Sequence, residues 1–78
     1  MAPPAAYTIF LVLSASHAVK GEGALAKAGI PCKLIPVPRS LSSQCGVCLR
    51  VDRSDRTRAT AVLTAALIQV AGIHDLES

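Results

Sequence analysis

The alternation of apolar and polar positions along the chain predicts its strands. Residues 7–13 are apolar at nearly every position, which is typical of a central strand covered on both faces. Residues 30–35 form a second apolar run, which Pro31 and Lys33 interrupt, so we expect this strand at a sheet edge. Residues 47–51 alternate apolar and polar side chains, and this period predicts a strand with one buried face.

A helix is predicted between the first two strands, over residues 17–28. Small and apolar side chains recur there at helical spacing and form one stripe, which consists of Ala18, Gly21, Leu25 and Ala28. Such small side chains allow a helix to lie close against a sheet. Ser14 or Ser16 is available as the N-cap, because a serine hydroxyl can accept a hydrogen bond from the backbone of the first turn. Gly29 is a suitable C-terminal stop.

A second helix over residues 60–70, ended by glycine, and a last strand over residues 73–76 complete the order βαββαβ. This is the ferredoxin-like arrangement, an α/β (α+β) fold in which two helices cover one face of a four-stranded antiparallel sheet. Residues 7–78 are expected to form a single domain behind a flexible tail of residues 1–6. Because residues 7–13 are apolar on both faces, we expect the open face of the sheet to form a homodimer or to meet a partner.

The composition argues against several classes of protein. Of the 78 residues, 51% are hydrophobic and only 3% aromatic, so an aliphatic core is expected without exposed aromatic platforms for nucleic-acid bases. The net charge of +3 suits a small anion or an acidic partner and is too weak to indicate DNA binding. The arginines within residues 50–58 are expected in a solvated turn and helix start. No apolar run approaches the roughly 20 residues of a membrane span, so we expect no contact with nucleic acid or membrane.

The cysteines indicate the compartment. Cys32, Cys45 and Cys48 make an odd number, whereas a secreted disulfide scaffold normally has an even one. We therefore predict a cytoplasmic protein with free thiols. Together with His17 the cysteines nominally supply a Cys₃His metal site, but the usual paired C-x-x-C knuckles are absent. We predict no metal and no cofactor.

The candidate functional site is the polar segment of residues 36–46, which joins the second and third strands. Beside two prolines it contains the residues Arg39, Ser42, Ser43, Cys45 and Gly46. Proline fixes φ and glycine permits unusual backbone geometry, so the segment is suited to hold one thiol in a set position. In the βαββαβ order this segment leaves the sheet at the end where the first helix begins. We therefore expect it to lie near His17 and the N-terminus of that helix.

Positive groups in this place would make Cys45 reactive. A helix N-terminus, an arginine and a protonated histidine each lower the pKa of a nearby thiol, and the thiolate is the form that accepts sulfur or selenium. Arg39 can bind an anionic group through two hydrogen bonds, and His17 can act as an acid, a base or a cation. The residues alone fit two other interpretations as well: an inert Cys45 in an ordinary hairpin loop, and solvated surface charges at His17 and Arg39.

Cys45 and Cys48 also form a C-x-x-C motif, which is typical of thiol–disulfide oxidoreductases. In thioredoxin-like proteins this motif begins a helix, whereas here it leads into a strand, where the two side chains would point to opposite faces. A dithiol role is therefore a secondary hypothesis. A second alternative is a small binding module that uses Arg39 and the helix N-terminus to hold an anionic metabolite or a partner's carboxylate.

Several short stretches carry a resemblance to a known family: His17-Ala18-Val19-Lys20 with Glu22, Ala28-Gly29-Ile30, Leu34-Ile35-Pro36-Val37-Pro38-Arg39, Leu41-Ser42-Ser43 and Cys45-Gly46. With these stretches the chain resembles the selenium/sulfur carrier protein-like family, a short bacterial domain, over most of its length. The Pro-Val-Pro-Arg-x-Leu-Ser-Ser-x-Cys-Gly segment is the specific part of the match. Three residues depart from the pattern expected for the family: Gly21, Gly23 and Cys48.

The resemblance implies roles for five residues of this segment. It implies that Cys45 is the carrier thiol, that its setting comprises Arg39, Ser42, Ser43 and Gly46, and that His17 and Glu22 belong to the family signature. We therefore predict a carrier protein rather than an enzyme with turnover of its own. It would hold selenium or sulfur on Cys45 as a perselenide or persulfide, between a cysteine desulfurase-like donor and an acceptor protein.

Overall fold

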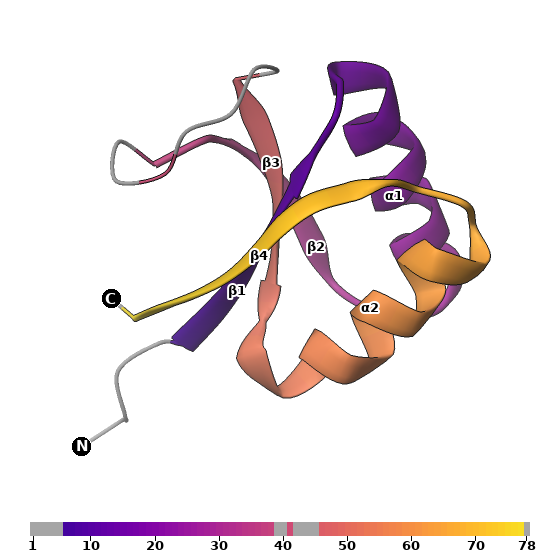
Figure 1. The fold of residues 1–78 in the computed structure, drawn as a ribbon. Coiled ribbons are helices and arrows are strands. Elements are labelled where there is room, and N and C mark those ends of the chain that lie inside the picture. The colour runs from indigo at the N-terminus through magenta and orange to yellow at the C-terminus, as the bar shows by residue number, and fades with distance from the viewer. Residues whose placement is uncertain (1–5, 39–40, 42–45, 78) are drawn as a thin grey trace.

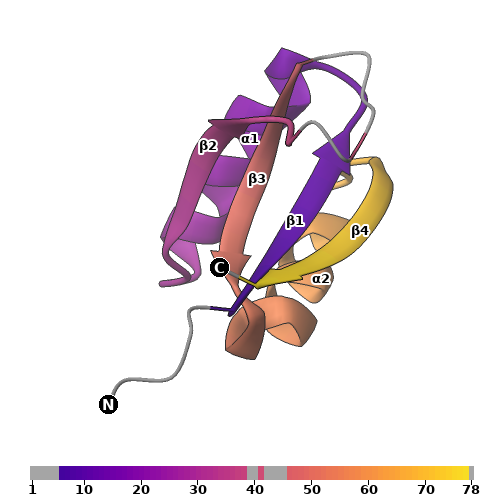
Figure 2. The same ribbon diagram turned by 90° about the vertical axis from the view of Figure 1, so that its left-hand side faces the viewer.

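The computed structural model describes residues 6–38, 41 and 46–77, which form one antiparallel sheet and two helices. The elements in chain order are β1 (Ala6–Val12), α1 (Ala15–Lys27), β2 (Cys32–Pro36), β3 (Val47–Asp52), a 3₁₀ turn (Arg53–Asp55), α2 (Arg56–Ala65) and β4 (Val70–Glu77). The strand order is β2-β3-β1-β4, and each neighbouring pair is antiparallel. Both helices lie on one face of the sheet (Figure 1), and Figure 2 shows the opposite face. The predicted ferredoxin-like fold is confirmed, including the position of β2 at an edge.

Local signals in the sequence set both ends of α1. The Oγ of Ser14 accepts a hydrogen bond from the backbone N–H of His17 at 3.3 Å, so Ser14 is the N-cap. At the other end Gly29 has a φ of +77°, and the N–H of Ile30 donates to the carbonyl oxygen of Leu25 at 2.9 Å. This pattern is the Schellman motif, which places glycine where the chain must take a left-handed conformation.

The stripe of small residues on α1 brings the helix close to the sheet. Ala18, Gly21 and Leu25 are buried as the spacing predicts. Ala28 is exposed, contrary to its place in the predicted stripe, because the chain has already left the helix at this C-cap position. A Cβ atom at Gly21 would lie only 2.8 Å from Cδ1 of Leu49 in β3. The close approach of helix and strand therefore depends on the missing side chain.

The second helix differs from its prediction. The apolar pattern predicts a helix over residues 60–70, but α2 starts earlier and ends at Ala65. Leu67 has a φ of +61°, and the N–H of Ile68 donates to a carbonyl oxygen in the last turn, so the chain leaves the helix at this point. The apolar residues that follow belong to a turn and to β4. Gly72, expected as the end of the helix, lies inside β4.

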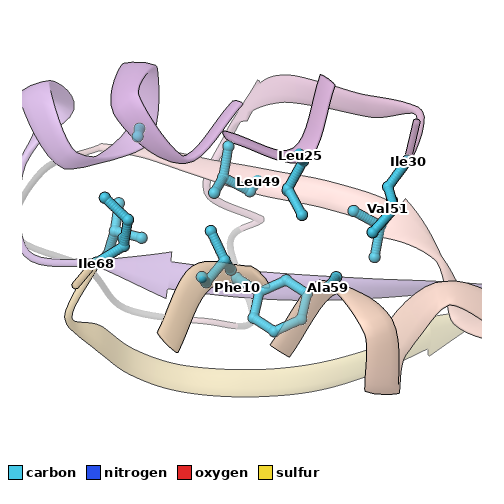
Figure 3. Close-up of a cluster of buried hydrophobic side chains, with 10 residues drawn as sticks. Phe10, Leu25, Ile30, Leu49, Val51, Ala59 and Ile68 are labelled. Carbon is cyan, nitrogen blue, oxygen red and sulfur yellow. The ribbon is translucent and has the colours of Figure 1, made fainter. Parts of the chain in front are cut away.

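The main core lies between the sheet and the helices (Figure 3). Its largest members are aliphatic side chains from both layers and one aromatic ring: Phe10, Leu25, Ile30, Leu49, Val51 and Leu63. Burial of one such side chain contributes about 1.5–3 kcal/mol relative to leaving it exposed. A chain with few aromatic residues is thus stabilised mainly by aliphatic packing on one face of its sheet.

A second apolar cluster lies on the face that the helices leave uncovered. It is centred on Ile9, Leu11 and Cys48, and both Ile9 and Cys48 are fully buried. Val37 and Leu41, from the connection between β2 and β3, pack against this cluster. In Figure 2 the chain that leaves β2 crosses in front of β3. The apolar centre of this face is therefore covered by the chain itself, and pairing of two copies through the same face stays a prediction.

Candidate functional site

The strand directions bring the start of α1 and the connection after β2 to one end of the sheet. β1 and β2 both run antiparallel to β3, so they are parallel to each other and their carboxyl ends lie together. β3 and β4 begin at this end. We call it the site end; in Figure 1 it is the end at which α1 starts and the chain leaves β2. Its described landmarks are Ser14, His17, Val37 and Gly46.

His17 lies in the first turn of α1, where Ser14 holds it in two ways. The Nδ1 atom of His17 is 2.7 Å from the Oγ of Ser14, and the backbone N–H of His17 donates to the same oxygen. One serine thus caps the helix and also orients the imidazole of His17. His17 is half-buried. The unpaired N–H groups of the first turn give this end of α1 a partial positive charge. An anion at the site end would therefore be stabilised.

The connection between β2 and β3 is held at its base by a backbone contact. The N–H of Val37 donates to the carbonyl oxygen of Gly46 at 3.1 Å, which extends the β2–β3 ladder beyond its last strand pair. Farther along, the N–H of Leu41 donates to the carbonyl oxygen of Pro38 at 2.9 Å. Gly46 has a φ of +76°, the left-handed region that favours glycine. The segment is thus anchored immediately next to Cys45.

The described part of the connection turns to the helix-free face of the sheet. Val37 and Leu41 pack there on the second apolar cluster, whereas His17 belongs to the helix that covers the other face (Figure 1). The connection and His17 therefore share the site end but approach it from opposite faces. The remaining predicted site residues lie outside the described residues, and their grouping stays a prediction: Arg39, Ser42, Ser43 and Cys45.

Cys48 is enclosed beneath this connection. It lies in β3 opposite Leu11, and its side chain is 0% exposed. Its Sγ lies 3.9 Å from the carbonyl oxygen of Pro36. Val37 and Leu41 cover the cluster to which it belongs, so this sulfur is not accessible to another protein in the folded chain. Such burial argues against Cys48 as the resolving thiol of a dithiol pair.

Cys32 lies at the start of β2, at the opposite end of the sheet, and is a free, half-buried thiol. Burial raises the pKa of the Cys32 thiol from 9.0 to about 11, and the negative charge of Glu22 adds to this effect. Cys32 is therefore protonated at neutral pH and is a poor nucleophile. Glu22, which the resemblance places in the signature, acts on Cys32 by disfavouring its thiolate.

The arginines that follow β3 bind other elements of the fold. Arg56 forms an ion pair with Asp75 at 2.6 Å, and Arg53 donates to the carbonyl oxygen of Leu76 at 3.1 Å. Arg58 donates to a carbonyl oxygen at the end of α1 at 3.3 Å. These contacts tie α2 and the 3₁₀ turn to β4 and α1, so these arginines serve the fold.

His74 of β4 is not among the predicted site residues. It is the cross-strand partner of Ile9, so its side chain lies on the same face of the sheet as Ile9. This is the helix-free face, on which Leu41 also packs. A Cβ atom at Gly72 would lie 3.2 Å from Nε2 of His74, so this glycine leaves room for the imidazole to extend along β4 toward the site end. No motif marks His74, and only the pairing register reveals its face.

Two further kinds of feature, a metal-ligand cluster and a membrane-spanning helix, are absent from the described residues. In that part of the chain, no group of three or more His, Cys, Asp or Glu side chains is placed to hold a metal ion. None of the helices within it has both the length and the apolar character needed to cross a bilayer.

Comparison with known families supports the resemblance found in the sequence. A family model described as "Putative Se/S carrier protein-like" matches residues 7–75. No curated protein and no solved structure matches the chain. The matched range contains the whole polar segment between β2 and β3 as well as His17, so every residue of the candidate site lies within it.

Proposed function

The chain belongs to the Se/S carrier protein-like family, and from that premise we propose that it carries sulfur or selenium on the thiol of Cys45. The cargo is held as a terminal persulfide or perselenide between a donor of the cysteine desulfurase class and an acceptor protein. In this role the chain is a carrier in a reducing cytoplasm and has no turnover of its own.

The observation that carries the proposal is that the two other cysteines are unsuited to the role, Cys48 because of its burial and Cys32 because of its pKa. A carrier thiol must be ionised near neutral pH and must be reachable by two partner proteins. Cys48 is fully buried, and the Cys32 thiol has a pKa of about 11. Neither meets both requirements. Cys45, in the segment that most specifically resembles the family, is the cysteine that remains.

The described groups at the site end favour negative charge. The positive end of α1, a helix of 13 residues, lies at the site end, and the Ser14 hydroxyl orients the imidazole of His17 there. The Val37–Gly46 hydrogen bond anchors the Cys45 segment at the same end. A thiolate and a terminal persulfide are both anions, so the same groups stabilise the empty and the loaded carrier. We place Arg39, Ser42 and Ser43 in the same setting, as the resemblance implies.

The transfer is an exchange between sulfur atoms. The Cys45 thiolate attacks the outer sulfur of a cysteine persulfide on the donor, the bond between the donor's two sulfurs breaks, and the donor leaves as a thiolate. One S–S bond forms at Cys45 while one breaks, so no external oxidant or reductant is consumed. Delivery repeats the step, with an acceptor thiolate attacking the outer sulfur on Cys45. A perselenide is transferred in the same way.

Intact-protein mass spectrometry tests the proposal after incubation with a cysteine desulfurase and either cysteine or selenocysteine. We expect one added sulfur or selenium atom on the wild-type chain and none on Cys45→Ser. Cys48→Ala is the matched control, because it removes a buried cysteine and should leave the adduct in place. Loss of the adduct in Cys48→Ala would support a thiol–disulfide pair instead. An adduct that persists in Cys45→Ser refutes the proposed role.

A further inference from the structure

A charged groove lies at the end of the sheet opposite to the site end. It opens where β1 begins, β2 begins and β3 ends, and its volume is about 200 Å³. Polar side chains from all three strands line it, namely Tyr7 of β1, Lys33 of β2 and Arg50 and Asp52 of β3. None of these residues takes part in the function proposed above.

Two cations lie side by side on neighbouring strands in the lining of this groove. Lys33 and Arg50 are direct partners in the antiparallel β2–β3 pair, and like charges in this position destabilise a sheet. Within the described part of the chain neither forms an ion pair with a carboxylate. The guanidinium of Arg50 instead lies over the ring of Tyr7, at 4.4 Å from the ring centroid. The carboxylate of Asp52, two residues farther along β3, neutralises neither cation through an ion pair.

We propose that this groove binds an acidic segment of a partner protein, with one aspartate or glutamate carboxylate seated between Lys33 and Arg50. A carboxylate there is attracted by both positive charges. Because Tyr7 already holds the guanidinium of Arg50, less conformational freedom is lost when a carboxylate binds to it. Charge complementarity of this kind also steers a partner toward the surface during encounter.

The size of the groove argues for a protein side chain rather than a cofactor. Pockets that bind small molecules have volumes of about 300–1,000 Å³ and enclose most of the ligand, whereas this groove is smaller, at about 200 Å³. A single acidic side chain fits such a volume. The groove lies far along the strands from His17 and Gly46, so a docked segment leaves the site end accessible. The proposal holds whether or not Cys45 carries sulfur.

Tyr7 provides a direct readout, because it is the chain's single tyrosine and the chain has no tryptophan. We expect a hexaglutamate peptide, titrated at low salt, to change the fluorescence of Tyr7 in a saturable manner. Lys33→Gln should weaken this binding about tenfold, which corresponds to the loss of one charge-assisted hydrogen bond. Lys27→Gln is the matched control, since it removes the same charge from an exposed position on α1, and it should change the affinity less than twofold.

Three outcomes overturn the proposal. The first is the absence of any saturable change in Tyr7 fluorescence. The second is equal weakening in Lys33→Gln and Lys27→Gln, which would mean that the peptide responds to net charge and not to the groove. The third is an equal response to free glutamate at the same carboxylate concentration, which would identify a small-anion site. Because the readout is fluorescence of the unloaded chain, its result is independent of the sulfur-transfer experiment.

Discussion

The backbone N–H of Val37 donates a hydrogen bond to the carbonyl oxygen of Gly46 at 3.1 Å, and this contact closes the base of the segment that carries Cys45. Gly46 accepts the bond with a φ of +76°. The residue that follows the thiol in the chain is therefore held in a left-handed conformation by the end of the β2–β3 ladder. We expect the reactivity of the thiol to depend on this conformation.

Gly46→Ala should lower the stability of the protein and slow its loading with sulfur. A left-handed conformation disfavours alanine by about 1–2 kcal/mol, and a Cβ atom at Gly46 would meet nothing within 4 Å, so the effect comes from the backbone alone. Urea denaturation measures the loss of stability, and the rate of adduct formation measures the loss of function. Unchanged stability in Gly46→Ala would show that the position does not require glycine.

The two glycines of α1 should respond to alanine in opposite ways. A Cβ atom at Gly23 would meet nothing within 4 Å, so Gly23→Ala gains the higher helix propensity of alanine, about 0.8–1.0 kcal/mol. A Cβ atom at Gly21 would lie 2.8 Å from Leu49 and 3.1 Å from Leu63, and overpacking of a core typically costs about 1–3 kcal/mol. We expect Gly21→Ala to be at least about 1 kcal/mol less stable than Gly23→Ala in urea denaturation. Equal stability of the two variants would contradict the close contact between α1 and β3.

Leu67→Gly should stabilise the protein by a few tenths to about 1 kcal/mol. Leu67 ends α2 with a φ of +61° and is 86% exposed, so it combines an unfavourable backbone conformation with little packing. Glycine removes the backbone strain, although it also increases the freedom of the unfolded chain and so offsets part of the gain. A thermal melt checks the prediction. A lower melting temperature would show that the leucine side chain makes stabilising contacts.

The raised pKa of Cys32 predicts a loss of stability at high pH. The thiol ionises near pH 9.0 in the unfolded chain, whereas burial and Glu22 hold its folded-state pKa at about 11. Between these values the unfolded state has released the proton and the folded state has not, so stability falls as pH rises. Urea denaturation at several pH values should show a shallower fall in Cys32→Ala. An identical pH dependence in both proteins would refute this assignment.

Much of the fold follows from local patterns, and the exceptions have physical causes. The run at residues 7–13 and the serine and glycine that bound α1 are local signals, and the structure confirms them. The apolar pattern extends α2 beyond its observed end at Ala65, because Leu67, Ile68 and Val70 continue a pattern that helices and turns share. In the structure the chain turns at Leu67, and this turn places Ile68 in the main core.

The candidate site is less accessible to sequence reasoning than the fold. The topology places the polar segment and the start of α1 at one end of the sheet, as the βαββαβ order implies. The packing of Val37 and Leu41 on the helix-free face is not foreseeable, because isolated apolar residues in a polar loop give no direction. The cross-strand pairing of the cations Lys33 and Arg50 depends on register, which no motif encodes. These features arise from contacts between segments that are far apart in the sequence.

The central claim is that Cys45 is the reactive cysteine and that the fold makes the thiols of Cys32 and Cys48 unreactive. Alkylation of the native wild-type protein at neutral pH, followed by peptide mass spectrometry, assigns a rate to each cysteine. We predict that Cys45 is labelled first, that Cys32 reacts slowly because its pKa is about 11, and that Cys48 is labelled only after unfolding. Labelling of Cys32 or Cys48 as fast as Cys45 would contradict the account.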